Sequence, residues 1–153
     1  MNTKPLTIRN ATKLWQLLQL AIDDAKEIQK DPVYELEMTV WHTRSRARTD
    51  VCFVCLAGAV MVRELGALPH QSLDPTSFGD DESITNKLNA INDLRNGFVH
   101  VAYHTMSNGG VLPELPHKVQ LASVDAHRWA DEPWTDDWKA HLALVEALKE
   151  ADL

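Results

Sequence analysis

The sequence predicts a mostly helical α+β domain, in which about four helices surround a buried central helix beside a small sheet of two or three strands. Three observations support this prediction: several segments repeat apolar residues at helical spacing, one short segment alternates apolar and polar residues, and one run is apolar almost all round. The chain has 153 residues, of which 44% are hydrophobic, so it is long enough to bury one core. We therefore expect a single globular domain over residues 1–153.

The first helix is predicted to follow Asn10, a residue type that caps helix N-termini. Apolar residues then recur every three or four positions as far as Ile28, and Asp31 with Pro32 ends the pattern because proline cannot continue a helix. Residues 33–41 alternate in character, which is typical of a strand with one buried face. That face consists of Tyr34, Leu36, Met38 and Val40.

A loop, the central helix and a long connection are predicted next. Residues 42–49 are polar and basic and have no period, so we expect a loop that leads to Asp50 as a helix cap. Residues 51–65 are apolar almost all round and are followed by Gly66, which predicts the buried central helix. Residues 66–82 combine prolines, glycines and a run of acidic residues, the composition of an exposed connection.

The second half of the chain predicts further helices and one more strand. Asp81 or Ser83 is expected to cap a helix that ends near Gly97, and the apolar spacing of residues 98–106 favours a helix over a strand. Residues 118–124 alternate apolar and polar side chains, so we expect them to pair with the first predicted strand.

Charge is distributed unevenly along the chain. Residues 1–64 carry nine basic and eight acidic side chains and residues 65–153 carry six and fourteen, so formal charges of +1 and -8 make up the total of -7. Nucleic-acid binding requires clustered basic residues, and the cluster of Arg44, Arg46 and Arg48 is small. We therefore expect no direct binding of nucleic acid. The acidic half suits a basic protein surface, including one that normally holds phosphates, or serves solubility alone.

The composition also predicts a cytoplasmic protein without a membrane anchor. The longest uncharged apolar run, residues 51–62, is shorter than the roughly 18 to 20 residues that span a bilayer. Residues 1–10 lack the apolar centre of a signal peptide. Cys52 and Cys55 are the only cysteines, and in a reducing compartment we expect free thiols.

Aromatic and acidic residues are interleaved near the end of the chain, where Asp136 is expected to cap the final helix. Large amphipathic rings among carboxylates suit an interface with a basic protein surface. The predicted partner-binding residues are Trp129, Asp131, Glu132, Trp134, Asp136 and Asp137, together with Asp80, Asp81 and Glu82. The alternative is structural: Trp138 lies in the core, and the other two tryptophans pack the preceding loop onto the final helix.

A metal or thiol site is predicted as an alternative. Cys52 and Cys55 are spaced to share a face in the first turn of the predicted central helix, and His100 and His104 are spaced to share a face of another helix. Two thiolates and two imidazoles can bind zinc tetrahedrally. If the cysteines instead pack as small apolar side chains, no cofactor is expected.

One segment resembles a known group of proteins. Trp41 and His42, a polar gap, and then Cys52 and the run from Val54 to Met61 are similar to a stretch in small accessory proteins of tailed bacteriophages, and the resemblance covers residues 33–62. It implies a setting of host takeover or defence inhibition, in which small acidic proteins commonly act by stoichiometric binding. It implies no active site.

The sequence thus favours a non-enzymatic, phage-type protein that binds and modulates or inhibits a host protein in the host cytoplasm through its acidic, Trp-containing surface. One alternative is a small zinc- or thiol-dependent enzyme that uses Cys52 and Cys55 with His100 and His104. Another is a self-assembling structural protein, such as a homodimer, whose exposed apolar patches pair copies of the chain. No glycine-rich phosphate loop or nucleophile signature in the sequence supports a further enzyme class.

Overall fold

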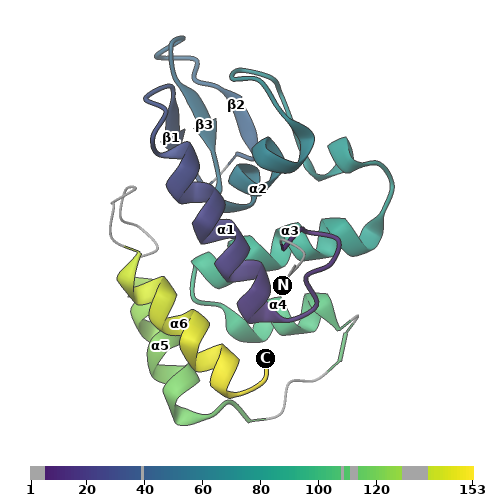
Figure 1. Ribbon diagram of the computed structural model, residues 1–153, viewed down its shortest axis with the longest axis vertical. Coiled ribbons are helices and arrows are strands. Elements are labelled where there is room, and N and C mark those ends of the chain that lie inside the picture. Colours follow the sequence, from purple (N-terminus) through teal and green to yellow (C-terminus); the bar gives the residue numbers. More distant parts are fainter. Residues whose placement is uncertain (1–5, 39, 108, 111–113, 129–137) are drawn as a thin grey trace, which may run out of the picture.

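Figure 1 shows the computed structural model, which describes residues 6–38, 40–107, 109–110, 114–128 and 138–153. These residues form six α-helices, one short 3-10 helix and three strands. The fold is therefore mostly helical α+β, as the sequence predicts. No helix in these ranges is long and apolar enough to cross a membrane.

The first helix, α1 (Leu14–Ile28), begins later than the prediction from Asn10. Asn10 instead accepts a hydrogen bond from the Thr7 amide at 2.7 Å, in a turn that precedes the helix. The start of α1 is capped by Gln16, whose side-chain oxygen accepts from the Lys13 amide at 3.0 Å. The predicted end of the helix is confirmed, and its apolar face is buried.

Three short strands form a mixed sheet of order β1–β3–β2. β1 (Tyr34–Leu36) runs parallel to β3 (Cys52–Val54), and β2 (His42–Arg44) runs antiparallel to β3. The predicted strand over residues 33–41 is confirmed only for its first part, and the predicted loop over residues 42–49 is wrong where β2 begins. A strand of three residues is too short to show a period in the sequence.

The apolar run of residues 51–65 divides into β3 and a shorter helix, α2 (Leu56–Leu65), which corrects the prediction of one continuous helix capped by Asp50. A short apolar run fits a buried strand as well as a buried helix, so periodicity does not separate the two. Cys55 is the N-cap of α2. Gly66 ends α2 in the left-handed conformation, as its position predicts.

The long connection after α2 contains a 3-10 helix, η1 (Pro75–Phe78), and leads to α3 (Glu82–Arg95). The side chain of Asp81 accepts a hydrogen bond from the Ser83 amide at 3.0 Å, so Asp81 is confirmed as the cap of α3. The next helix is α4 (Val99–Met106), which confirms the helical interpretation of that segment.

The predicted strand over residues 118–124 is wrong, because these residues lie within α5 (His117–Arg128). The buried side chains of α5 are Val119, Ala122 and Ala126. Their spacing is helical, whereas Leu121, which the alternating pattern placed on the buried face, is exposed. Two of the three buried residues are small alanines, which made the helical period weak in the sequence.

The last helix, α6 (Lys139–Glu150), follows Trp138, which is buried as the structural alternative predicts. The expected cap, Asp136, lies outside the described residues. The Trp138 indole N–H donates to the side-chain oxygen of Gln29, just beyond α1, at 3.1 Å. This bond fixes the start of α6 against the end of α1.

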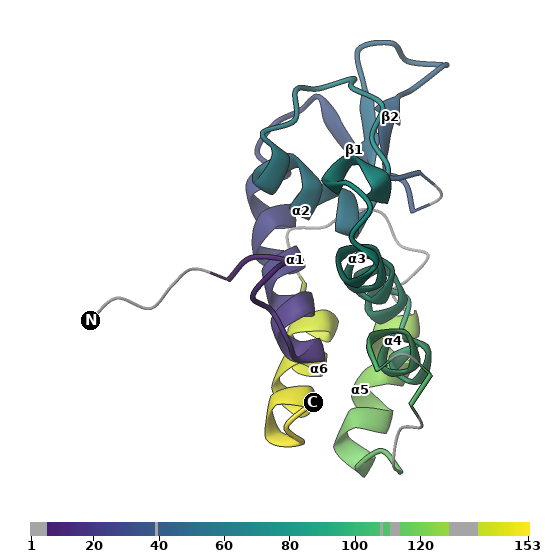
Figure 2. The same cartoon turned by 90° about the vertical axis from the view of Figure 1, so that its right-hand side faces the viewer.

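The helices form two layers, and the sheet lies at one end of the molecule beside α2. Figure 2 shows α1 and α6 on one side and α3, α4 and α5 on the other. Buried apolar side chains from both layers form one continuous core cluster. The residues at the N-terminal end of α3, and one side each of α4 and α5, lie outside this core and face the solvent.

Candidate functional site

The two cysteines lie in different elements and not in one helical turn, which corrects the sequence prediction. Cys52 belongs to β3 and Cys55 precedes α2, and both are buried. Cys55 Sγ accepts hydrogen bonds from the Gly58 amide at 3.2 Å and from the side-chain amide of Asn92 at 3.3 Å. Burial raises the pKa of the Cys55 thiol although these donors act in the opposite direction. The geometry suits a neutral thiol that caps a helix.

The four residues of the predicted zinc site do not come together. His100 and His104 are exposed on α4, whereas Cys52 and Cys55 are buried where β3 leads into α2. Among the residues that the structure describes, no group of three or more His, Cys, Asp or Glu side chains is placed to hold a metal ion.

A polar cluster that the sequence did not predict surrounds Cys52. His42 Nδ1 lies 2.5 Å from the backbone carbonyl oxygen of Gln71, and because a carbonyl can only accept, Nδ1 carries the proton. His42 Nε2 is then an acceptor. It lies 3.1 Å from the hydroxyl of Tyr34 and 3.6 Å from Cys52 Sγ. One imidazole thus connects all three strands to the segment that follows α2.

Burial determines the protonation of this cluster. It raises the pKa of Tyr34 to about 12, raises the pKa of the Cys52 thiol and lowers the pKa of His42. The phenol, the thiol and the imidazole are therefore all neutral near pH 7. Because His42 is 1% exposed and Cys52 is 0% exposed, the cluster is suited to holding the sheet together and not to attacking a substrate.

A second polar group, in which only Asp24 is buried, links α1 to α2. Arg63 Nε donates to Asp24 at 2.6 Å, and the same guanidinium contacts Glu64 at 2.9 Å. The Glu64 carboxylate also accepts from the Ile8 amide at 2.7 Å. Asp24 is 7% exposed, and burial raises its pKa to about 6 against the opposing effect of Arg63.

Three of the predicted partner-binding acids are described, and they lie together at the N-terminal end of α3. Asp80, Asp81 and Glu82 are all exposed. Asp81 has a structural role, because it caps α3 and lies 3.6 Å from the guanidinium of Arg9. Asp80 and Glu82 form no hydrogen bond or ion pair with the residues described here. The remaining predicted residues lie outside the described ranges: Trp129, Asp131, Glu132, Trp134, Asp136 and Asp137.

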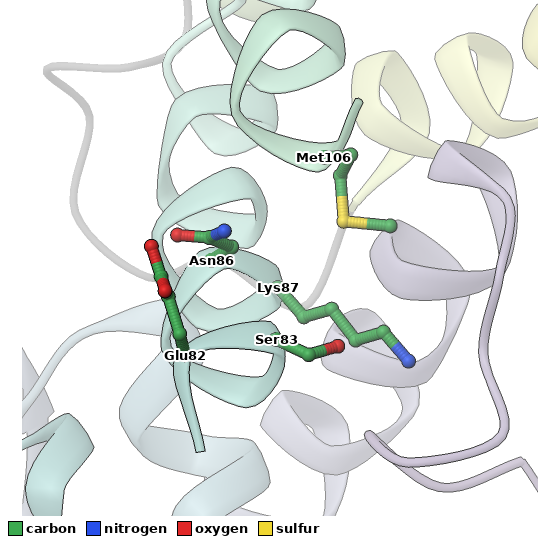
Figure 3. Close-up of a pocket in the computed structure, with 5 residues that line it drawn as sticks. All are labelled: Glu82, Ser83, Asn86, Lys87 and Met106. Carbon is green, nitrogen blue, oxygen red and sulfur yellow. The ribbon is translucent and has the colours of Figure 1, made fainter. Parts of the chain in front are cut away.

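A small pocket opens beside Glu82, where the first turns of α3 face the end of α4 (Figure 3). Its volume is about 160 Å³, and it is lined by Glu82, Ser83, Asn86, Lys87 and Met106. The Lys87 side chain extends away from Glu82, and its ammonium donates to the backbone carbonyl of Arg9 at 3.0 Å. Small-molecule sites commonly measure about 300 to 1,000 Å³. This pocket is smaller, and its size suits a single side chain.

No protein-family model, characterised protein or solved structure matches the chain. Function is therefore inferred from the chain's own residues. In the described part, the acidic run of residues 80–82 and the adjoining pocket are open to a partner, whereas the histidine and thiol chemistry of the sheet is buried.

Proposed function

We propose that this is a phage-type accessory protein that binds a host protein and modulates or inhibits it. Its binding surface is acidic, and it comprises residues 80–82 together with the Trp-containing segment of residues 129–137. The resemblance of residues 33–62 to phage accessory proteins supports the setting. The charge of -8 on residues 65–153 supports a partner with a basic surface, since opposite potentials speed and orient association.

The exposed acidic run beside a pocket of side-chain size is the observation that supports this proposal most. Asp80 and Glu82 are exposed and form no bonds within the described residues, so their charges are available to a partner. Glu82 lines the pocket with the hydroxyl of Ser83 and the amide of Asn86. An arginine or lysine of the partner that enters the pocket would meet a carboxylate and two further hydrogen-bond acceptors, while the Lys87 ammonium is held away from Glu82 on the Arg9 carbonyl.

The buried polar chemistry supports a binding role over a thiol enzyme. Cys52 has no exposed surface, and the sulfur of Cys55 already accepts two hydrogen bonds. His42, the imidazole nearest to a thiol, is held by the carbonyl of Gln71. A substrate would have to open the sheet to reach any of these groups.

Affinity capture from bacterial lysate, with two variants matched in net charge, tests the proposal. Asp80→Asn with Glu82→Gln removes two charges from the acidic run, and Asp50→Asn with Glu114→Gln removes two exposed charges elsewhere. We expect the wild-type chain and the control variant to retain one stoichiometric partner, and the first variant to lose about tenfold or more in affinity. Higher salt should weaken the complex because the attraction between charges is screened.

Two results would overturn the proposal. Undiminished binding by the Asp80→Asn, Glu82→Gln chain would remove the proposed surface, and an equal loss in both variants would show that net charge alone drives capture. A zinc assay on the same samples tests the alternative. One zinc per chain that is lost in a Cys52→Ala variant would favour the metal enzyme over the binding protein.

A further inference from the structure

Two neighbouring helices present an apolar surface that the proposed function does not use. Of the six large apolar side chains that are exposed in the described residues, four belong to α5 or to α4 and its N-cap. They are Phe98, Val101, Leu121 and Val124, each between 44% and 56% exposed. Apolar side chains gathered on one surface mark an interaction site more often than scattered ones do.

These four residues lie on one continuous surface because the start of α4 rests directly against α5. The Ser123 hydroxyl donates to the carbonyl of Gly97 at 2.6 Å, and His127 Nδ1 donates to the carbonyl of Asn96 at 2.8 Å. A Cβ atom on Gly97 would lie 2.6 Å from the Ser123 carbonyl oxygen, so only glycine permits this approach. The ring of Phe98 consequently lies 5.3 Å from the ring of His127.

Helical spacing extends this contact into a row. Residues three apart are neighbours on a helix surface, so Val101 continues from Phe98 along α4. On α5, Val124 and then Leu121 continue from His127 in the same way. The α4–α5 row therefore runs from Val101 through Phe98, His127 and Val124 to Leu121, within the layer that Figure 2 shows opposite α1 and α6.

Among the described residues of α4 and α5, the exposed charges beside the α4–α5 row are balanced, although the whole chain is acidic. α4 contains no Asp, Glu, Lys or Arg. On the exposed side of α5, Asp125 and Arg128 flank the row with opposite signs, and neither forms an ion pair with another described residue. A second copy of the chain presents the same pair of charges, so two copies related by a two-fold axis can place Asp125 of one opposite Arg128 of the other.

We propose that the α4–α5 row is the interface of a homodimer in which two copies meet about a two-fold axis. An isologous contact brings the same patch of both copies together, so Phe98 and Val124, which lie on either side of His127 in the row, pack against their counterparts. Asp125 of each copy then faces Arg128 of the other copy. Residues 80–82 of the proposed host-binding surface are not part of the row, whereas its residues 129–137 follow Arg128 directly in the sequence.

Analytical ultracentrifugation with two charge-insertion variants tests the position of the interface. Val124→Glu places a charge within the row, and Leu68→Glu places the same charge on the most exposed of the large apolar side chains outside it. For wild type and Leu68→Glu we expect a mass approaching twice 17.2 kDa as the concentration rises. For Val124→Glu we expect the dimer dissociation constant to rise about tenfold or more.

Mixing two charge-reversed chains tests the pairing across the interface. Asp125→Arg gives each copy two positive charges beside the row, and Arg128→Asp gives each copy two negative ones. Each variant alone should be more monomeric than wild type, and an equimolar mixture should recover the dimer mass. Contacts within one chain cannot produce recovery on mixing, so this result separates pairing between copies from effects on the fold.

Three outcomes would overturn the proposal. The first is a wild-type chain that stays monomeric up to about 200 µM, since a dimer with a dissociation constant of about 1 µM would be largely assembled at that concentration. The second is a dimer that Val124→Glu leaves intact or that Leu68→Glu weakens equally. The third is an equimolar mixture of the two charge-reversed variants that remains monomeric.

Discussion

At the scale of single residues, Asp24 shows how burial and an ion pair compete. The Arg63 guanidinium, 2.6 Å away, favours the charged carboxylate, but the loss of hydration outweighs it and raises the Asp24 pKa from 3.8 to about 6. The nearby charges of Glu64 and Asp23 also raise this pKa. Because the folded-state pKa exceeds that of the unfolded chain, the folded state binds a proton more readily between these values. Folding stability from this group therefore falls as the pH rises through that window.

We predict that Asp24→Asn flattens the dependence of the unfolding free energy on pH between about pH 4 and pH 6. A rise in pKa from 3.8 to about 6 corresponds to roughly 3 kcal/mol. The unfolding free energy of the wild-type chain should therefore fall by up to that amount, relative to the variant, as the pH rises from about 4 to about 6. Urea unfolding followed by circular dichroism at several pH values measures the difference. Glu27→Gln, an exposed change on the same helix, is the control and should keep the wild-type slope. A wild-type slope in Asp24→Asn would contradict the prediction.

At the scale of elements, the first turn of α2 packs closely against Trp41, the residue that precedes β2. A Cβ atom on Gly58 would lie 2.0 Å from the backbone carbonyl oxygen of Trp41 and 2.5 Å from a methyl group of Val54. Within an isolated helix alanine is more stable than glycine by roughly 1 kcal/mol. We expect the close contact between Gly58 and Trp41 to outweigh this intrinsic preference of a helix for alanine over glycine.

We predict that Gly58→Ala lowers the unfolding free energy by about 1 to 3 kcal/mol, because a backbone atom cannot move aside as a flexible side chain can. Gly66→Asn at the other end of α2 is the control. No atom lies within 4 Å of a Cβ atom there, and asparagine tolerates the left-handed conformation, so we expect a change below about 1 kcal/mol. Chemical denaturation measures both variants, and a stabilised Gly58→Ala chain would show that the contact relaxes easily.

The helical character of α1 and α3 is predicted from the sequence because most of their buried apolar residues are large and regularly spaced. The buried face of α1 is built mainly of leucine and isoleucine, and its period is plain. α5 was predicted as a strand because Val119 and Leu121 suggested alternation, while Ala122 and Ala126 occupy the buried face instead. β3 was absorbed into a predicted helix because its three residues are all apolar and continue directly into the apolar start of α2.

The candidate site also contains a part that the sequence predicts and a part that it does not. Composition alone identified the acidic run of residues 80–82, and the structure places it at the surface. The pocket beside it was not predicted, because Met106 meets α3 only through the packing of α4. The contact between His42 and Cys52 was missed for a related reason: it depends on the pairing of β2 with β3, which no local pattern encodes.

At the scale of the whole molecule, the last residues of the chain close on the first helix. The backbone carbonyl oxygen of Leu153 accepts hydrogen bonds from the amides of Leu14 at 2.5 Å and Trp15 at 3.3 Å. Lys13 adds an ion pair with Asp152 at 3.2 Å. The first amides of a helix have no acceptor within the helix itself, so residues distant in sequence complete the start of α1.

We predict that removing residues 152–153 lowers the unfolding free energy by about 1 to 2 kcal/mol, since two amides of α1 lose their acceptor. Lys13→Ala removes the exposed ion pair and the hydrogen bond from Lys13 Nζ to the Asp152 backbone oxygen but leaves the Leu153 acceptor in place, so its effect should be below about 1 kcal/mol. Hydrogen exchange gives the local measurement: the amide protons of Leu14 and Trp15 should exchange faster in the shortened chain, while those in the middle of α3 should change only with global stability. Lost stability with unchanged exchange at Leu14 would instead mean that Leu153 acts through its packing against the core.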